Sequence, residues 1–210
     1  MTMVLMGVML LAWEVFSVIG TVAFAISGAI IAMDEEYDLF GIYILGIVTA
    51  FGGGALRNLL IGLPVSTLWS QEMMFQIALV AITLVLLIPH HLIEHWNRWG
   101  YITDGIGLSA FAIQGAMHAV HQDLPLGAVI VAAVLTGAGG GIIRDLLAGR
   151  RPIVFRHEIY AVWAASAGLL IGLELFAGDL FLYVLFIIIT LLRFVSYSRG
   201  WSLPTRKYSK

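Results

Sequence analysis

The stretch TAFGGGALRNLLIG at residues 49–62 recurs 87 residues later as TGAGGGIIRDLLAG at residues 136–149, and 8 of the 14 positions are identical. Each copy places three adjacent glycines and one arginine within an apolar run. A second pair of stretches has the same spacing: GTVAFAISGAIIAM at residues 20–33 matches GLSAFAIQGAMHAV at residues 107–120, again at 8 of 14 positions. One constant spacing over two regions indicates that the chain contains a duplicated unit.

The composition is typical of an integral membrane protein. Of the 210 residues, 60% are hydrophobic and 11% are charged, whereas soluble domains carry about 25% charged residues. The apolar residues form runs of roughly 17 to 25, the length that a helix needs to cross a hydrocarbon core of about 30 Å. We therefore expect a single membrane domain over residues 1–210. No basic residue precedes the first apolar run and no small-residue cleavage site follows it, so we interpret this run as part of the first span and not as a removable signal peptide.

Seven membrane-spanning helices are predicted from hydropathy and from the turn residues and charges between the apolar runs. The expected helices cover about residues 14–33, 39–63, 73–88, 101–120, 124–147, 159–177 and 180–194.

The basic residues predict the orientation of these helices. With seven spans, ten of the 11 Lys and Arg residues fall on one side of the membrane, and Arg57 alone falls on the other. Since Lys and Arg are retained on the cytoplasmic side, we expect the N-terminus outside and the C-terminus inside the cell membrane. The ten residues on the cytoplasmic side are Arg98, Arg144, Arg150, Arg151, Arg156, Arg193, Arg199, Arg206, Lys207 and Lys210.

The duplicated unit contains three spans, which is an odd number. The second copy must therefore enter the membrane from the opposite side, which gives the inverted repeat of many transporter folds. We expect repeat one over about residues 14–88, repeat two over about residues 101–177, and a seventh helix with a basic tail over about residues 180–210. The predicted fold is an all-α integral membrane protein with two inverted three-helix repeats and one additional helix.

The triple glycines predict a break or a bend in the second and fifth helices. Each glycine inside a helix costs about 1 kcal/mol relative to alanine, and freed backbone groups are tolerated in a membrane only where they face protein or water. We therefore expect both helices to turn toward an interior cavity. Close packing of small residues is the alternative, although it requires a spacing of four and not adjacency. The residues at the predicted bends are Gly52, Gly53, Gly54, Gly139, Gly140 and Gly141.

The two arginines of the motif lie within their spans. Arg57 lies about 6 residues, or roughly 9 Å, inside the end of its span, and a charge at that depth must reach the interface, pair, or face water. Arg144 has Asp145 beside it, and Asp104 begins the fourth span, where it can reach one of the arginines. By inversion we expect a pore or cavity that bends near the middle of the membrane, with one charged group at each mouth.

Other kinds of site are poorly supported. The glycines lack the Lys and Ser/Thr of a phosphate loop and follow no strand, and we expect no nucleic-acid partner. His91 and His95 share helical spacing and His90 lies next to them, but the tryptophans beside them favour an interfacial role over a metal site. No combination of nucleophile, base and orienting group is present, and cysteine is absent. We therefore expect neither an enzyme nor a metal or cofactor site.

The residues resemble the prokaryotic trimeric intracellular cation (TRIC) channels, within a wider bacterial family also labelled glycine transporters. The resemblance rests on FAISGA and FAIQGA, on GGGALRN and GGGIIRD, and on TDGIGLSAF, and it extends over about residues 20–177. It implies an hourglass pore in each subunit between kinked second and fifth helices, a homotrimer, and passage of monovalent cations, chiefly potassium. One departure is Asn58, where the second copy has Asp145. Arg57 therefore lacks the neighbouring ion pair that is available to Arg144.

Three functions stay open. A passive channel for potassium or sodium is favoured, because bent helices expose carbonyls that replace water around a cation. A transporter of glycine or another small amino acid is the alternative, since inverted repeats also characterise transporters. A membrane scaffold would leave the intramembrane arginines unexplained. Membrane lipid is the other expected partner, and the candidate polar lining, for which core packing is equally open, consists of Thr49, Thr136, Ser27 and Gln114.

Overall fold

The computed structural model describes residues 2–88, 96–155, 159–174 and 178–204. Within these ranges the chain forms seven α-helices and two short 3-10 helices. The histidines of the expected interfacial cluster, His90, His91 and His95, lie outside the described residues. The elements are α1 (Thr2–Asp34), α2 (Leu39–Leu60), η1 (Val65–Ser70), α3 (Glu72–Leu86), α4 (Trp96–His121), α5 (Leu126–Leu147), η3 (Ile153–Phe155), α6 (Tyr160–Gly172) and α7 (Asp179–Ser198).

The seven helices are those predicted from the sequence, but several of their ends differ. Helix α1 starts at Thr2 because the apolar run continues well before residue 14. Helix α2 ends at Leu60 and not at residue 63, since Gly62 has a φ of 76° that a helix cannot continue, and η1 forms within the expected loop. Gly149, with a φ of 69°, ends α5 in the same way. Helix α6 ends at Gly172, earlier than the predicted residue 177.

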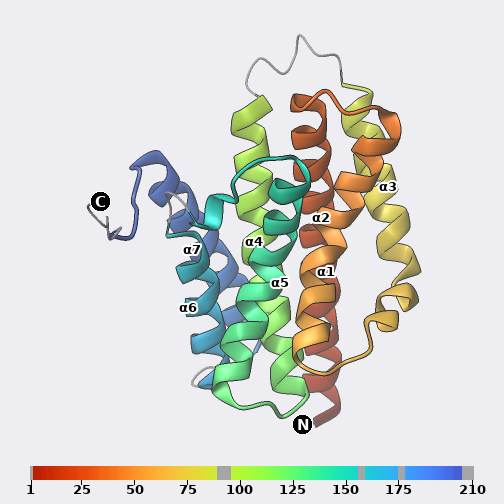
Figure 1. The fold of residues 1–210 in the computed structure, drawn as a ribbon. Helices are drawn as coiled ribbons and strands as arrows, with labels where there is room; N and C mark the ends of the chain where they lie inside the picture. The colour runs from red at the N-terminus through yellow and green to blue at the C-terminus, as the bar shows by residue number, and fades with distance from the viewer. Residues whose placement is uncertain (1, 89–95, 156–158, 175–177, 205–210) are drawn as a thin grey trace.

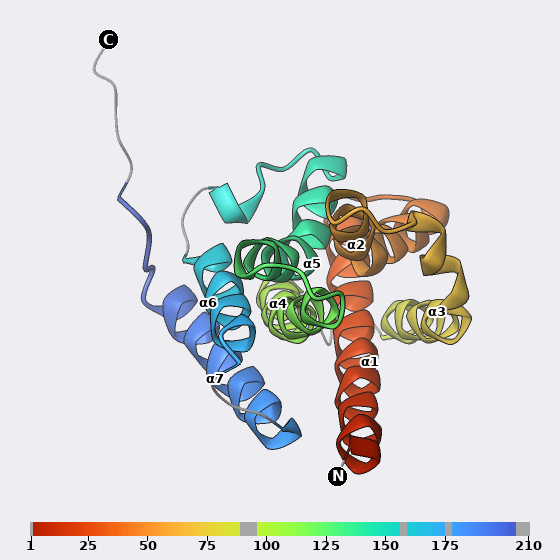
Figure 2. The ribbon, with the colours of Figure 1, turned by 90° about the horizontal axis from the view of Figure 1, so that it is seen from below.

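Four helices, α1, α2, α4 and α5, form the centre of the bundle (Figures 1 and 2). Helix α3 packs against α1 and α2 on one side, and α6 packs against α4 and α5 on the other. Helix α7 lies outside the repeat and packs against α4 and α6. Consecutive helices run in opposite directions, so α1–α3 and α4–α6 enter the bundle from opposite ends (Figure 1).

The inverted repeat is confirmed by contacts that recur 87 residues apart. A Cβ atom on Gly28 would lie 2.5 Å from the Thr49 hydroxyl oxygen, and a Cβ atom on Gly115 would overlap the Thr136 hydroxyl in the same way. The two turns that follow α1 and α4 also correspond, because each contains a residue with positive φ: Glu36 at 57° and Asp123 at 51°. The side chains of Phe24 and Phe111, also 87 residues apart, meet edge to face with their ring centres 5.3 Å apart.

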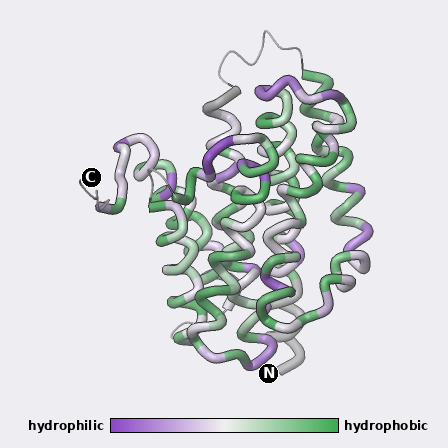
Figure 3. The backbone as a smooth tube through the Cα atoms, viewed as in Figure 1, coloured by the Kyte–Doolittle hydropathy of each residue, from purple (hydrophilic) through white to green (hydrophobic). Residues whose placement is uncertain are grey.

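The helices present apolar side chains to their surroundings, as a multi-pass membrane protein requires. By length and composition, α2, α5, α7 and the α1 segment Leu11–Asp34 can cross a membrane, whereas α3 and α6 are apolar but shorter. Hydrophilic residues gather at the turns and at a few points within the bundle (Figure 3). Large exposed hydrophobic side chains, such as Leu84 on α3 and Ile187 and Leu191 on α7, cover the outer helices.

Candidate functional site

The triple glycines do not interrupt their helices. Helix α2 is continuous from Leu39 to Leu60, and α5 is continuous from Leu126 to Leu147. The predicted breaks are therefore wrong for both helices, whereas a bend without a break stays a prediction. The cost of glycine in a helix is offset here by the close approach of another helix, which only a residue without a side chain permits.

Helices α2 and α5 cross at the middle glycines of the two motifs. A Cβ atom on Gly53 would overlap the carbonyl oxygen of Thr136, and a Cβ atom on Gly140 would overlap the carbonyl oxygen of Thr49. A Cβ atom on Gly139 would lie 3.1 Å from the Cα atom of Gly53. The two backbones are thus in direct contact, so the packing interpretation holds for these three glycines.

The third glycine of each motif faces away from this crossing. A Cβ atom on Gly54 would lie 3.5 Å from the Leu68 side chain and 3.9 Å from the guanidinium of Arg57, which are ordinary contact distances. A Cβ atom on Gly141 would lie 3.0 Å from the Tyr160 hydroxyl oxygen. Gly54 and Gly141 line two separate cavities, one beside each arginine. The crossing therefore separates two sites that are related by the repeat.

Arg144 is buried in a network of charged and polar groups. Its Nη1 atom donates to Asp104 Oδ1 at 2.7 Å and to Ser27 Oγ at 2.6 Å. Its Nη2 atom lies 2.8 Å from Asp145 Oδ1, and the other oxygen of Asp145 accepts a hydrogen bond from the backbone N–H of Ile153 at 3.1 Å. Only 2% of the Arg144 side chain is exposed. The ion pairs expected for Arg144 are present, and together with the hydrogen bond to Ser27 they link α1, α4 and α5.

The cavity on this side is closed. Its lining includes Gly141, Ile142 and Tyr160, together with Pro152, Ile153 and Val154 from the segment after α5, and the space between them does not admit a water molecule. The hydrogen bond from Ile153 to Asp145 holds this segment against the Arg144 network. The segment around Ile153 therefore forms one wall of this cavity.

Arg57 is equally buried but has neutral partners. Its Nε and Nη2 atoms donate to Asn58 Oδ1 at 3.0 and 2.9 Å, and the Asn58 amide donates to Thr67 Oγ1 at 3.0 Å and to the Pro64 carbonyl at 3.4 Å. Among the described residues, no carboxylate oxygen lies within 4 Å of the Arg57 guanidinium. Its side chain nevertheless has only 4% of its surface exposed. Asn58 occupies the position that Asp145 has in the second repeat. Arg57 therefore has no ion pair in the part of the chain that is described.

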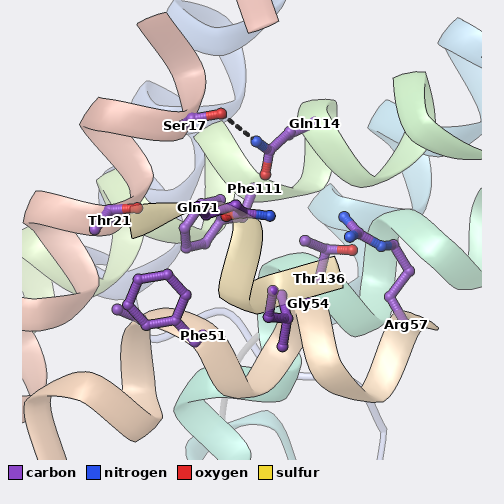
Figure 4. A pocket seen from close by; sticks show the side chains of 11 residues that line it. Ser17, Thr21, Phe51, Gly54, Arg57, Gln71, Phe111, Gln114 and Thr136 are labelled. Atoms are coloured by element: carbon purple, nitrogen blue, oxygen red, sulfur yellow. Dashed lines mark hydrogen bonds between the residues drawn. The ribbon is translucent and has the colours of Figure 1, made fainter. Parts of the chain in front are cut away.

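The cavity beside Arg57 is small and polar on one side. Its volume is about 20 Å³, enough for about one water molecule. Figure 4 shows the Arg57 guanidinium turned toward Gln114 and Thr136, which lie across the cavity. The Gln114 amide donates to Ser17 Oγ, and Ser17 donates to the Trp13 carbonyl at 2.8 Å. The rest of the lining consists of Thr21, Ala50, Phe51, Gly54, Leu68, Gln71 and Phe111.

Comparison with known proteins places the chain in a family. The sequence model of the family described as Glycine transporter matches residues 14–90 and 101–174. The chain belongs to this family. It is 63% identical over 198 residues to the UPF0126 membrane protein YvgT of Bacillus subtilis, covering 94% of this chain and 98% of that protein. It is 36% identical over 166 residues to the UPF0126 inner membrane protein YadS of Escherichia coli K12, covering 77% of each chain.

Solved structures similar to this member of the glycine transporter family are TRIC channels. A TRIC cation channel is 33% identical, covers 94% of this chain and 98% of its own, and superposes with a TM-score of 0.79. The TRIC orthologue from Rhodobacter sphaeroides is 29% identical, covers 90% of this chain and 98% of its own, and has a TM-score of 0.80. The resemblance to prokaryotic TRIC channels is therefore confirmed. It supports a cation channel and indicates a channel or transporter rather than an enzyme.

The four polar residues predicted to line a path lie in different places in this family member. Thr136 and Gln114 line the Arg57 cavity, whereas Ser27 accepts a hydrogen bond from Arg144 on the opposite side of the crossing. Thr49 lines neither of these two cavities. Its hydroxyl donates to the carbonyl of Leu45 at 2.6 Å, as the Thr136 hydroxyl donates to that of Ala132. Thr49 contributes to the site through its carbonyl oxygen at the helix crossing.

Arg193 is a site residue that sequence reasoning misplaced. It was expected in the basic cytoplasmic tail, but it is a buried residue of α7 whose Nη2 atom lies 3.9 Å from Asp104 Oδ2. Its guanidinium carbon lies 4.7 Å from the centre of the Tyr160 ring, close enough for a cation–π interaction. Its position within the apolar run of residues 179–198 was the available signal, because the same argument singled out Arg57. Among the described residues, this buried cluster therefore contains two arginines and two aspartates.

A second ion-pair group joins α1 to the segment after α5. Arg150 donates to Asp34 and Glu35, which end and follow α1, and all three side chains are about one-third exposed. Partial burial acts to lower the pKa of Arg150, but the hydrogen bonds to the two carboxylates raise it above its ordinary value. The Tyr37 hydroxyl adds a hydrogen bond to the carbonyl of Leu147 at 2.7 Å. These contacts hold the segment after α5, which forms part of the wall of the Arg144 cavity, against the end of α1.

Proposed function

We propose that this protein is a potassium-permeable channel for monovalent cations, with a path in each subunit between α2 and α5. The observation that carries the proposal is the crossing of the glycine-rich helices α2 and α5. This crossing lies between two cavities, each lined by an arginine, that correspond to each other in the inverted repeat. The similarity to TRIC cation channels over more than nine-tenths of the chain supports the same function.

The proposed path passes the carbonyl oxygens at the crossing. The carbonyls of Thr49 and Thr136 lie beside Gly140 and Gly53, where they are held by backbone contact and not by side chains. Carbonyl oxygens replace the hydration shell of a monovalent cation, so a small separation of α2 and α5 would create a cation site there. Among the described residues, the Arg144 cluster contains as many carboxylates as guanidinium groups, which removes the electrostatic objection to a nearby cation path.

The conformation described here corresponds in this proposal to a closed channel. The Arg144 cavity admits no water, and the segment around Ile153 covers it. Conduction then requires two movements: separation of the glycine crossing and release of this segment from Asp145.

The proposal includes a homotrimer in the cell membrane, in contact with lipid, with the N-terminus outside and the C-terminus in the cytoplasm. The basic residues support this orientation. Arg150 and Arg151 follow the C-terminal end of α5 and Arg199 follows that of α7, whereas Arg57 is in the last turn of α2, which ends at the opposite end of the bundle (Figure 1). The similarity to trimeric TRIC channels supports the oligomeric state. Cross-linking in native membranes tests the trimer, and cysteine labelling at Ser66 and Ser202 from each side tests the orientation.

Transport of glycine or another small amino acid is the second candidate function. The description of the matched family favours it, and the Arg57 guanidinium has the charge to bind a carboxylate. However, the cavity beside Arg57 holds about one water molecule, whereas glycine has five non-hydrogen atoms. A transporter would therefore need a considerably wider conformation than a channel for single ions.

Liposome experiments separate the two functions. Liposomes with the purified protein should release a potassium load when a potential is applied, and radiolabelled glycine should not accumulate above protein-free liposomes. Saturable glycine uptake without potassium release would contradict the channel proposal and support the transporter. If neither flux occurs in the wild type and in the Arg57→Ala and Arg144→Ala variants, and assembly is intact in all three, the scaffold interpretation is supported.

A further inference from the structure

We propose that the cavity beside Arg57 binds a small monovalent anion of halide size, with chloride as the probe. The inference concerns binding at one end of the proposed cation path, where a bound anion would offset the positive charge of Arg57. Its starting point is the pairing of Arg57 and Arg144 across the inverted repeat, since the same backbone positions surround both arginines.

Each carboxylate around Arg144 corresponds to a neutral polar side chain around Arg57. Asp145 corresponds to Asn58, and Asp104 corresponds, 87 residues earlier, to Ser17. Ser17 lies at the Arg57 cavity just as Asp104 contacts Arg144, so the equivalence holds in the folded chain. Both replacements remove a negative charge and keep a polar side chain. The Arg57 site is thus a copy of the Arg144 site without its anions.

The charge of Arg57 is largely removed from bulk water, because only 4% of the residue is exposed. A buried cation is destabilising unless an anion or several hydrogen-bond acceptors face it. The Asn58 oxygen supplies one acceptor, which the Nε and Nη2 atoms share. The Nη1 atom makes no hydrogen bond to any described residue, and Arg57 lines the cavity. A positive charge, an available N–H donor and a space therefore coincide.

The size and lining of the cavity select the ligand. A volume of about 20 Å³ fits one water molecule or one single-atom ion, and the positive charge favours the anion. Further N–H and O–H donors surround the space: the Gln114 amide, of which one proton is used by Ser17, the Gln71 amide and the Thr21 hydroxyl (Figure 4). Among the lining residues of this cavity, none carries a negative charge. Amide, hydroxyl and guanidinium donors around a space of this size form a halide site.

The test measures thermal unfolding of the detergent-solubilised full chain by tryptophan fluorescence, in sodium salts of chloride, bromide or gluconate at equal ionic strength. Gluconate is too large for the cavity. A ligand that binds only the folded state stabilises it, so replacing gluconate with chloride or bromide should raise the unfolding temperature by about 2 to 4 °C for millimolar-range binding. An equal unfolding temperature in all three salts would overturn the proposal.

Two variants separate site binding from general salt effects. Asn58→Asp supplies the carboxylate that Arg144 already has, and Arg57→Gln removes the charge. Both should lose the difference between chloride and gluconate, whereas Arg150→Gln, which changes a distant exposed arginine, should keep it. The readout is the anion dependence and not the absolute unfolding temperature, so a moderate loss of stability does not obscure it.

A direct measurement completes the test. Crystals grown in sodium bromide should show an anomalous scattering peak within about 3.5 Å of the Arg57 guanidinium, the range of a long hydrogen bond. The peak should be absent from Asn58→Asp crystals. A wild-type cavity without such a peak, or an anion effect of equal size in Asn58→Asp and the wild type, would show that the cavity holds only water.

Discussion

Asp104 of α4 and Arg144 of α5 form an ion pair at 2.7 Å, and each of their side chains is at most 2% exposed. The same aspartate faces Arg193 of α7 at 3.9 Å through its other oxygen. One carboxylate thus lies between two guanidinium groups from different helices. It joins the second repeat to the helix that lies outside the repeats.

Replacing this aspartate should strongly destabilise the fold. Asp104→Asn keeps the shape of the side chain but leaves the cluster with one uncompensated positive charge. Breaking a buried ion pair on one side costs about 3 to 5 kcal/mol, and we expect a loss of this size in the free energy of unfolding. Denaturation of the solubilised protein measures it.

The matched control is Asp123→Asn, which makes the same chemical change at an exposed turn. Asp123 has a φ of 51°, a conformation that asparagine also tolerates. We expect a change within about 0.5 kcal/mol, as for most surface substitutions. Equal effects of the two substitutions would contradict the structural role given to Asp104.

The glycine crossing predicts a second stability effect. A side chain on Gly140 would meet the Thr49 carbonyl oxygen and the Phe24 ring, and the backbone oxygen cannot move aside. Gly140→Ala should therefore push α2 and α5 apart and cost about 1 to 3 kcal/mol, the range for overpacked cores. Thermal unfolding of the variant measures the loss.

Gly127 supplies the comparison for this experiment. It lies in the first turn of α5, and a Cβ atom there would meet nothing within 4 Å. Gly127→Ala should leave stability unchanged or raise it slightly, by up to about 1 kcal/mol, because alanine favours the helix. If Gly140→Ala were as well tolerated, the backbone contact at the crossing would be disproved.

Gly54 predicts an effect on conduction without an effect on folding. Its Cβ position has ordinary contacts at 3.5 and 3.9 Å and faces a cavity of about 20 Å³. Gly54→Ala should therefore keep the unfolding temperature of the wild type and lower the unitary conductance at least about twofold, since a methyl group occupies most of the space for one water molecule. Wild-type conductance in this variant would place the ion path elsewhere.

The Arg150 group should contribute much less than the Arg144 network. Its side chains are about one-third exposed, and exposed ion pairs contribute roughly 0.2 to 1 kcal/mol each. A double-mutant cycle with Arg150→Gln and Asp34→Asn should give a coupling energy in this range that decreases as salt is added. A coupling of several kcal/mol, or one that salt leaves unchanged, would show that this group is buried in the membrane-embedded protein.

Most of the fold could be predicted from the sequence, because the spacing of 87 residues between matching stretches is visible in the chain itself. It placed Arg57 and Arg144 at corresponding positions and supplied Asp104 and Asp145 as partners for Arg144. It did not show that the helices stay unbroken at the glycines, because the local cost of glycine in a helix is visible in the sequence whereas the opposing helix is not. Gly53 and Gly140 remain helical because the lack of a side chain at each allows the backbone of the other helix to approach.

The misplacement of Arg193 has a similar cause. The positive charges in the C-terminal tail suggested a cytoplasmic position for every arginine of that region, and only the fold brings Arg193 beside Asp104. The cavity next to Arg57 could not be predicted from the sequence either, because its walls come from α1, α2, α4, α5 and the segment around η1. Contacts between distant helices, not local patterns, determine these parts of the site.

The central claim is that cations cross this protein between α2 and α5. A planar bilayer recording with a tenfold potassium chloride gradient tests it most directly, for the wild type and for Gly54→Ala. We expect unitary currents that reverse at a potential of about 59 mV, the value for a tenfold gradient of a monovalent ion. The sign should be that of cation selectivity, and the amplitude should be smaller in the variant. Absence of unitary currents, or reversal at the chloride potential, would contradict it.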